Sequence, residues 1–221
     1  MEIYHIINRG VDKRKIFIND KDYLRFIHDL FEFNDDNYIE SSFRNSFVNK
    51  KYEINQNKKR DLLVYIHCFC LMPNHYHLLL SPLKNNAISK FMHKLNKGYS
   101  RYFNEKYERK GALFEGKYKK ILIKKDRHFI HVPFYIHLNP LDLIEKNWRN
   151  RELKNFNLAI KFLENYRWSS HLDYLGIKNF PSVIYQKFIL DFFDNHNIYK
   201  KSIYEWLKQI DINLIKNFLL E

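Results

Sequence analysis

The sequence has 221 residues, of which 45% are hydrophobic and 17% aromatic, a composition that supports a packed core and excludes a globally disordered chain. Lysine and arginine total 38 against 25 acidic residues, which gives a formal net charge of +13. Such an excess favours a polyanionic partner, most often nucleic acid, although a source proteome rich in lysine and asparagine would produce it too.

The two cysteines, Cys68 and Cys70, are too few and too close together for a disulfide framework, which is typical of the reducing cytoplasm. On a strand they share one face while His67 faces away from them, so the sequence disfavours a zinc site. No apolar stretch follows a basic start at the N-terminus, and no apolar run approaches the roughly 20 residues of a membrane span. We therefore expect a cytoplasmic protein with no membrane partner.

A strand and a helix are expected first along the chain. Residues 2–7 are apolar and β-branched, which predicts a strand, and residues 8–10 (Asn-Arg-Gly) predict a turn at its end. Asp20 can cap a helix that runs from Lys21 to about Phe33, because apolar residues recur there at helical spacing.

Residues 34–60 differ in character from what precedes them, being dense in Asn, Asp, Ser and Lys. We interpret them as a long exposed insertion with a short strand at 52–54. The apolar stretch 62–71 then predicts a buried strand, followed by a Met-Pro-Asn turn at 72–74 and a second strand over 75–80. Two strands this close in sequence should pair antiparallel.

The second half of the chain begins with a long helix. Asn85 or Asn86 is expected to cap it, and its apolar residues recur with the helical period to about Tyr107. Residues 111–125 are interpreted as a loop that leads into a strand.

A further helix is predicted over 126–137. Pro133 must lie in its first turn or kink it, and the Asn-Pro pair at 139–140 ends it. Beyond residue 141 the pattern is helical and rich in aromatic residues, with a compact turn at 166–170 and short helices over 183–195 and 202–221.

The predicted order is strand, helix, strand, strand, helix, strand, helix. It resembles the split strand-helix-strand arrangement of ferredoxin-like domains. We therefore predict an α+β fold, in which an antiparallel sheet carries helices on one face. This domain would span residues 1–150, with the insertion at about 34–60, and a helical C-terminal extension would follow over 151–221.

The stretch LMPNHYHLLL, at 71–80, carries two histidines on either side of one bulky residue. Because side chains alternate along a strand, His75 and His77 share one face while Tyr76 points to the other. Two imidazoles side by side on a rigid strand form half of a divalent-metal site. The spacing alone is common, and a surface histidine beside a satisfied core histidine would give the same pattern.

A second candidate group lies further along the chain. Tyr135 precedes Asn139 by four residues, so on a helix the two side chains share a face. A phenol can attack a phosphodiester and hold it as a covalent phosphotyrosine, provided that its oxygen is helped to lose its proton. A Mg²⁺ or Mn²⁺ ion held by His75, His77 and Asn139 could polarise that phosphate. Taken alone, Tyr135 is one of 16 tyrosines and is more simply explained as a core or surface aromatic residue.

Four motifs in order, LMPNHYHLLL, KLNKGYSRYFN, GALFEGKYKK and YIHLNP, resemble the single-tyrosine transposases of the HUH superfamily, and most of all the REP-associated tyrosine transposases. The opening YHIINRG fits as well, so that the resemblance covers about residues 3–142. The segment YRWSSHLDYLG, at 166–176, is also similar to one that follows the core in that group.

The resemblance implies a ferredoxin-like sheet that carries His75 and His77 as metal ligands on a central strand. It also implies that Tyr135 is the nucleophile on a flanking helix and Asn139 the third ligand. Proteins of this family cut and rejoin single-stranded DNA near short hairpins through a 5′-phosphotyrosine, without an external energy source. The chain would act as a monomer or as a homodimer, with the tyrosine supplied by the same chain or by its partner.

The sequence departs from the family pattern in three places. A Val-Pro pair at 132–133 precedes the tyrosine where a plain helical sequence is more usual, and the insertion at 34–60 is longer than expected. Pro140 is followed by Leu141 and Asp142 rather than by valine and a basic residue. The last departure affects DNA contacts at that point rather than the catalytic residues.

Basic residues of the long helix, of the next strand and of the first strand's end are candidates for phosphate contacts. Tyr99, Tyr102 and Tyr118 are candidates for stacking on unpaired bases, with core packing as the alternative for Tyr99 and Tyr102. The basic residues of the helix could instead form an ordinary solvent-exposed helix face that binds no DNA. The candidates are Arg9, Lys90, Lys94, Lys97, Arg101, Lys117, Tyr118, Lys119 and Lys120.

Three functions compete on this basis. The first is a DNA-strand transferase, the second a metal-dependent nuclease in which water attacks, and the third a transposase-derived protein that binds hairpin DNA without cleaving it. A covalent adduct with single-stranded DNA separates the first from the others, because only a protein nucleophile forms one.

Overall fold

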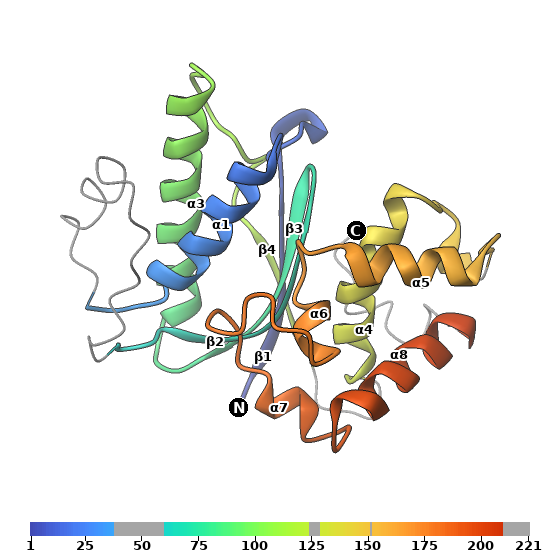
Figure 1. The fold of residues 1–221 in the computed structure, drawn as a ribbon. Helices are drawn as coiled ribbons and strands as arrows, with labels where there is room; N and C mark the ends of the chain where they lie inside the picture. The colour runs from blue at the N-terminus through green and yellow to red at the C-terminus, as the bar shows by residue number, and fades with distance from the viewer. Residues whose placement is uncertain (38–59, 124–128, 151, 210–221) are drawn as a thin grey trace.

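The computed structural model describes residues 1–37, 60–123, 129–150 and 152–209, so most of the predicted insertion, including its strand at 52–54, lies outside the described residues. At its centre is an antiparallel four-stranded sheet with strand order β2-β3-β1-β4 (Figure 1). With one helix after the first strand and one after the third, this is the order of a ferredoxin-like domain, and the predicted α+β fold is confirmed. The elements are β1 (Ile3–Arg9), α1 (Asp20–Glu32), β2 (Val64–Met72), β3 (His75–Pro82), α3 (Ala87–Lys106) and β4 (Lys119–Ile123).

The two long helices begin close to their predicted positions. Helix α1 starts at Asp20 with Asn19 as its N-cap, one residue earlier than predicted, because Asp22 accepts the Asn19 backbone N–H at 3.2 Å and closes the first turn. Asn86 is the N-cap of α3 and has a left-handed backbone conformation (φ 58°), which asparagine tolerates better than most residues.

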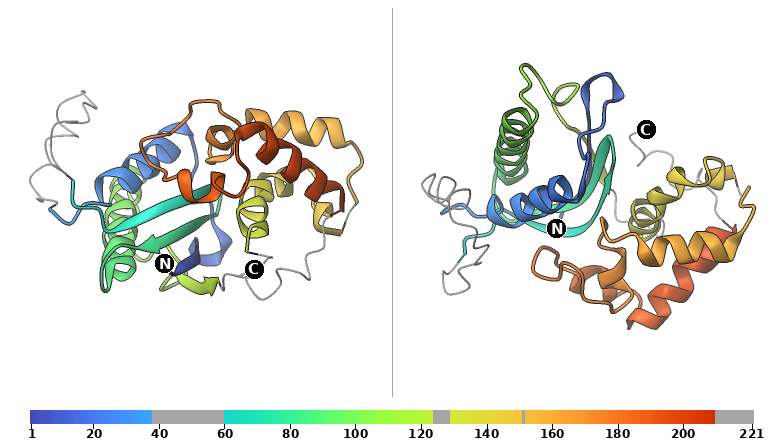
Figure 2. Two further views of the ribbon diagram at one scale, coloured as in Figure 1. Left: turned by 90° about the horizontal axis from the view of Figure 1, so that it is seen from below. Right: turned by 45° about the horizontal axis from the view of Figure 1, so that its top comes forward.

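Helices cover both faces of the sheet. On one face, α1 and α3 pack with Tyr76, Leu78 and Leu80 of β3 in an apolar core, and these are the helices predicted for one face. On the other face, α4 (His131–Leu138) packs against β2 and β3 together with residues of the C-terminal extension. Figure 2 shows the sheet between these two groups of helices.

The C-terminal extension joins the second core, in which Tyr174, Tyr199 and Ile203 are fully buried. The helix predicted over 183–195 is only one turn long, and the part of the last predicted helix beyond residue 209 lies outside the described residues. The C-terminal extension therefore shares one apolar core with the sheet, and a domain boundary at residue 150 stays a prediction. The short elements are η1 (Val11–Lys13), η2 (Asn139–Leu143), η3 (Trp148–Asn150), α5 (Phe156–Asn165), α6 (His171–Tyr174), α7 (Lys187–Leu190) and α8 (His196–Gln209).

The segment 166–170 docks on the free edge of β2 rather than forming an isolated turn. Its backbone continues the hydrogen bonding of the sheet, with the Leu71 N–H donating to the Trp168 carbonyl (2.9 Å) and the Ser170 N–H to the Phe69 carbonyl (3.0 Å). The extension is thus attached to the sheet by main-chain bonds as well as by its apolar side chains.

The prediction that His67 faces away from the cysteines is wrong. A bulge between Ile66 and Cys68 inserts one extra residue into β2, which breaks the alternation of side chains at His67. The His67 ring bonds the Ser81 hydroxyl at 2.7 Å and packs against Phe188, on the same face of the sheet as Cys68. Both cysteines are buried free thiols.

Helix α4 begins at His131, later than the predicted start at Asp126, which lies outside the described residues. Pro133 lies in the first turn, where its missing N–H would have had no acceptor within the helix. The helix therefore runs without a kink to Leu138, and its tyrosine lies in the middle. In the described parts of the chain, no helix combines the length and the apolar character that crossing a membrane requires.

Candidate active site

Strand β3 presents His75 and His77 on the sheet face opposite α1 and α3, as the alternation predicted. Their ring centroids are 5.0 Å apart and their ring planes are nearly perpendicular. His77 is fully buried and His75 is 7% exposed, so the pair lies at the point where the buried part of the strand reaches the surface. In the antiparallel register His77 is opposite Ile7 of β1 and His75 is opposite Arg9.

Each imidazole is held through its Nδ1 atom. Asn74, in the turn that precedes β3, bonds Nδ1 of His75 through its side-chain oxygen at 2.6 Å, and Nε2 of His5 lies 2.9 Å from Nδ1 of His77. Hydrogen bonds at one ring nitrogen fix the orientation of a metal-binding histidine and direct the other nitrogen to the ion. The pair therefore fits a divalent cation bound through its two Nε2 atoms.

His5 was not among the residues predicted from the sequence. It belongs to β1 and its imidazole stacks on that of His77, with ring centroids 5.2 Å apart. The only signal in the sequence is that His5 is a polar residue within an otherwise apolar strand, with Ile3 and Ile7 on the same face. Its pairing with His77, 72 residues away, depends on the register of the two strands.

Helix α4 places Tyr135 beside this pair. Its ring centroid is 6.1 Å from that of His77 and 6.4 Å from that of His5, each with an edge-to-face orientation. The Tyr135 side chain is fully buried, and the tilted ring of Trp148 packs on it at 6.3 Å. The structure therefore brings the predicted tyrosine and the two predicted histidines together within one chain.

Asn139 follows one turn after Tyr135, as predicted, and is fully buried. Its side-chain amide nitrogen donates to the Tyr135 carbonyl at 2.9 Å, and its side-chain oxygen accepts a hydrogen bond from Arg149, also at 2.9 Å. The atom that would bind a cation is thus in contact with a guanidinium group. For Asn139 to act as the third ligand, this guanidinium group must move, because two positive charges repel each other at such short range.

Arg149, on η3, was missed entirely by the sequence interpretation. Besides bonding Asn139, its guanidinium group lies 3.4 Å from the Tyr135 hydroxyl and 5.3 Å from the centre of the Tyr135 ring. Asp142 holds it by an ion pair and also accepts the indole N–H of Trp148 at 2.6 Å. No spacing rule connects Arg149 to Tyr135, because the chain between them folds back through η2.

The predicted basic residues of α3 separate into two groups. Three of them are engaged with other parts of the chain, and Lys97 lines a cavity next to the loop that precedes β4. The engaged residues are Lys90, in an ion pair with Asp36, Lys94, which donates to the Asp35 carbonyl at 2.8 Å, and Arg101, 2.7 Å from Glu105.

The other predicted DNA-binding residues gather at the ends of β1 and β4. Arg9, Lys117 and Lys119 line a cavity of about 280 Å³ beside the paired histidines, since Arg9 is opposite His75 in the sheet. Tyr118 lines the cavity next to α3 instead. Lys120 lies over the ring of Tyr4, with its ammonium group 5.2 Å from the ring centre.

Among the described residues, no group of three or more His, Cys, Asp or Glu side chains is arranged to hold a metal ion. A cation at the two histidines of β3 would therefore need oxygen ligands as well, from an amide, from water or from a bound phosphate. Mixed nitrogen and oxygen coordination of this kind suits Mg²⁺ or Mn²⁺ when oxygen ligands predominate.

Comparison with known proteins identifies the family. A family model described as "Transposase IS200 like" matches residues 2–139, the segment from β1 to the asparagine after the site tyrosine. The chain belongs to the IS200-like transposase family. Transposases process DNA, so this transposase has a DNA partner at the coarsest level, in agreement with its positive charge.

Two further comparisons concern individual proteins. No curated protein matches this transposase. A solved structure of a REP-associated tyrosine transposase bound to a REP hairpin aligns with 65% of this chain and 68% of its own, at 12% sequence identity and a TM-score of 0.41.

Proposed function

We propose that this transposase nicks and rejoins single-stranded DNA through a 5′-phosphotyrosine on Tyr135, next to a Mg²⁺ or Mn²⁺ ion held by His75 and His77. The observation that carries the proposal is the position of the Tyr135 ring, whose centroid lies 6.1 Å from that of the His77 imidazole on the same face of the sheet. A nucleophile and a partial metal site that meet in this way suit phosphoryl transfer.

The proposed step exchanges one phosphodiester bond for another. The Tyr135 hydroxyl gives up its proton and its oxygen attacks phosphorus, the P–O3′ bond breaks, and the 3′ oxygen leaves and takes up a proton. In the reverse direction a 3′ hydroxyl attacks the phosphotyrosine, and the phenol recovers its proton. When bound, the cation would offset the negative charge that develops on the phosphate and on the leaving oxygen. Since one phosphodiester replaces another, no external energy source is required.

Arg149 is proposed to position the phenol and to stabilise its ionised form. A guanidinium group that faces a phenol oxygen favours the negative charge that attack requires. The same residue bonds Asn139, so its departure toward the scissile phosphate would release the amide oxygen for the cation. In the family pattern a basic residue stands two positions after the proline, where this chain has Asp142. Arg149, which is paired with Asp142, would supply that positive charge instead.

Access of DNA to Tyr135 requires a movement, because this side chain is fully buried. Trp148 and Arg149 of η3 cover it, and both are attached to Asp142. Displacement of η3, or rotation of α4, would open the site. Tyr135 lies beside His77 of its own chain, which favours a site completed within one chain, and exchange of α4 between two copies in a homodimer is the alternative.

A second candidate function is the binding of hairpin DNA without cleavage. It is favoured by the burial of Tyr135 and by the contact between Asn139 and Arg149, which together describe a closed site. A binding protein derived from a transposase would keep the fold and the basic surface and lose the opening movement.

The test is covalent trapping. Single-stranded DNA from the flanks of the gene is incubated with the protein and Mn²⁺ and analysed on a denaturing gel. We expect a protein–DNA adduct that is lost in Tyr135→Phe, while this variant still binds DNA. Tyr185→Phe is the matched control, since Tyr185 stacks on Tyr65, which pairs with Ser81 at the end of β3 distant from His75, and it should form the adduct normally.

The other outcomes select the alternatives. Cleavage by Tyr135→Phe would support a nuclease that uses water. Binding without cleavage at every concentration of Mg²⁺ or Mn²⁺ would support the non-catalytic function.

A further inference from the structure

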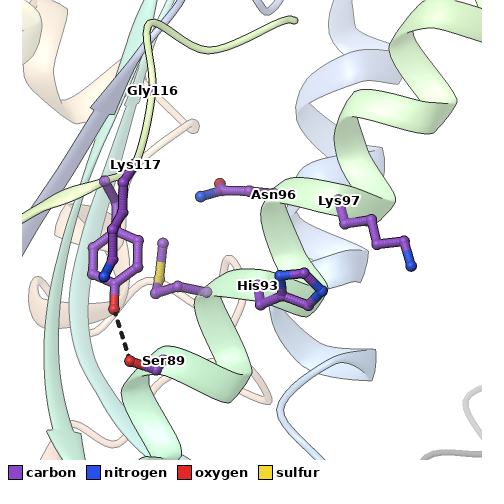
Figure 3. A pocket seen from close by; sticks show the side chains of 8 residues that line it. Ser89, His93, Asn96, Lys97, Gly116 and Lys117 are labelled. Carbon is purple, nitrogen blue, oxygen red and sulfur yellow. Dashed lines mark hydrogen bonds between the residues drawn. The ribbon is translucent and has the colours of Figure 1, made fainter.

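A second cavity, of about 370 Å³, lies between α3 and the loop that precedes β4. Figure 3 shows Asn96 pointing from α3 toward this loop, whereas His93 and Lys97 extend from other sides of the helix. A hydrogen bond of 3.3 Å between Ser89 and the Tyr118 hydroxyl closes one end (Figure 3). The lining residues are Ser89, Met92, His93, Asn96, Lys97, Gly116, Lys117 and Tyr118.

The orientation of the Asn96 amide is set by the strand that carries the paired histidines. Tyr76, between His75 and His77, donates its hydroxyl proton to the side-chain oxygen of Asn96 at 2.5 Å. The amide nitrogen of Asn96 is therefore the atom that it can offer to a ligand, and it can only donate. Lys117, which also lines the cavity, carries a donor as well, so the polar lining favours a ligand rich in acceptors.

The cavity adjoins the one beside the paired histidines. Both are lined by Gly116 and Lys117, and Asn8, at the end of β1, donates to the Gly116 carbonyl at 3.4 Å. The cavity beside the paired histidines also includes Arg9, which is opposite His75 in the sheet. A chain of nucleotides that leaves the paired histidines along Arg9 and Lys117 would therefore reach Tyr118.

We propose that this cavity holds one unpaired nucleobase of the DNA strand, with a preference for guanine or thymine, which carry a carbonyl oxygen at C6 or C4, over adenine or cytosine, which carry an amino group there. Its volume lies at the lower end of the range of about 300–1,000 Å³ for small-molecule sites, which accommodates one base and not a duplex. Tyr118 supplies an aromatic surface for stacking, and the lysines at the rim supply phosphate contacts. The inference rests on the single-stranded DNA substrate of the proposed function.

Gly116 provides a direct way to fill the cavity. A Cβ atom built on Gly116 would meet no atom within 4 Å, so a larger side chain can be introduced at this cavity-lining position without displacing its neighbours. Ala112→Leu is the matched control for Gly116→Leu, because Ala112 is an exposed residue of the same loop that does not line the cavity.

The experiment is photocrosslinking with two oligonucleotides that differ at single positions. One carries 5-iododeoxyuridine, which presents a carbonyl oxygen, and the other carries 5-iododeoxycytidine, which presents an amino group at the same place. With the unaltered protein we expect a crosslink in the peptide that contains Tyr118, at least fivefold stronger for iododeoxyuridine. Gly116→Leu should weaken it at least tenfold, and Ala112→Leu should leave it unchanged.

The proposal is overturned if no position of the iodinated base gives this crosslink, or if Gly116→Leu retains it. Equal crosslinking by the two bases would overturn the preference for a carbonyl oxygen. Adduct formation by Tyr135 is measured on the same samples. An adduct without the crosslink leaves the proposed function standing and removes the nucleobase site, whereas the crosslink without an adduct does the reverse.

Discussion

The two faces of the sheet are packed with different chemistry. The face covered by α1 and α3 is filled with aromatic and aliphatic side chains, among them Phe26, Tyr76 and Tyr99. The face covered by α4 and the C-terminal extension also buries imidazoles, namely those of His5, His67, His77, His137 and His171. Both faces thus depend on apolar burial, while the second also buries several imidazoles that can be protonated.

Strand β3 contributes side chains to both faces of the sheet. Along β3 the residues alternate between the apolar core and the histidine face. The tightly packed side chains of the apolar core therefore hold the strand rigid and fix the positions of the histidines on its other face. The faces should therefore respond differently to pH and to mutation.

The largest expected difference is in the response to acid. Burial lowers the pKa of His67 and of His171 to about 4, and burial beside His171 lowers the pKa of His137 well below its usual value. Unfolded histidines titrate near pH 6.5, so between pH 6.5 and 4 the unfolded state binds more protons and stability falls as pH falls. Each histidine contributes roughly 1.4 kcal/mol per pH unit in this window.

Urea unfolding between pH 7.5 and 4.5 measures this dependence. On the opposite face Asp22 has a lowered pKa, since the hydrogen bonds from Lys106, Tyr107 and the backbone outweigh its burial. Its contribution is lost only as pH falls below its unfolded value of about 4. A free energy of unfolding that stays constant from pH 7 to 5 would contradict the expected contrast.

The second prediction concerns the apolar face. Phe26 is fully buried, with its ring centroid 4.8 Å from that of Tyr76 and 5.0 Å from that of Tyr99. Phe26→Ala should lower the free energy of unfolding by about 3–5 kcal/mol, because it removes apolar burial and leaves a cavity. Leu24→Ala, at a 44% exposed position of the same helix, is the control and should cost under about 0.5 kcal/mol.

The third prediction concerns the attachment of the extension to the histidine face. The Ser170 hydroxyl accepts the Phe69 backbone N–H at 2.9 Å and lies 2.7 Å from Nε2 of His137. Ser170→Ala should destabilise the protein by about 1–3 kcal/mol, since it leaves buried polar groups without their partner. Thermal unfolding of Ser170→Ala beside the exposed control Ser182→Ala measures this, and equal stabilities would show that the Ser170 hydroxyl adds nothing to the main-chain and apolar attachment.

The smallest effect is expected for single basic residues. If DNA follows the cavities along Lys117, Lys117→Ala should reduce the slope of log affinity against log salt concentration by about 1. Lys90→Ala should leave the slope unchanged, because Lys90 is already paired with Asp36. Fluorescence anisotropy with labelled single-stranded DNA at several salt concentrations compares the two, and equal slopes for both variants would place the DNA elsewhere.

Much of the local structure could be predicted because it depends on short-range periodicity. The alternation that brings His75 and His77 to one face follows from strand geometry, and the spacing of Tyr135 and Asn139 follows from the helical repeat. The cap at Asn86 and the turn before β3 follow from the backbone preferences of individual residues. The positions of these residues relative to one another within each element were therefore correct.

The tertiary structure decided what the sequence could not. His5 reaches His77 only through the register of β1 and β3, and Arg149 reaches Tyr135 only because the chain folds back after α4. The bulge at His67 and the pairing of Lys90 with Asp36 likewise depend on which segments pack together. Composition and periodicity describe a residue and its near neighbours along the chain, whereas such contacts depend on how the whole chain minimises its exposed apolar surface.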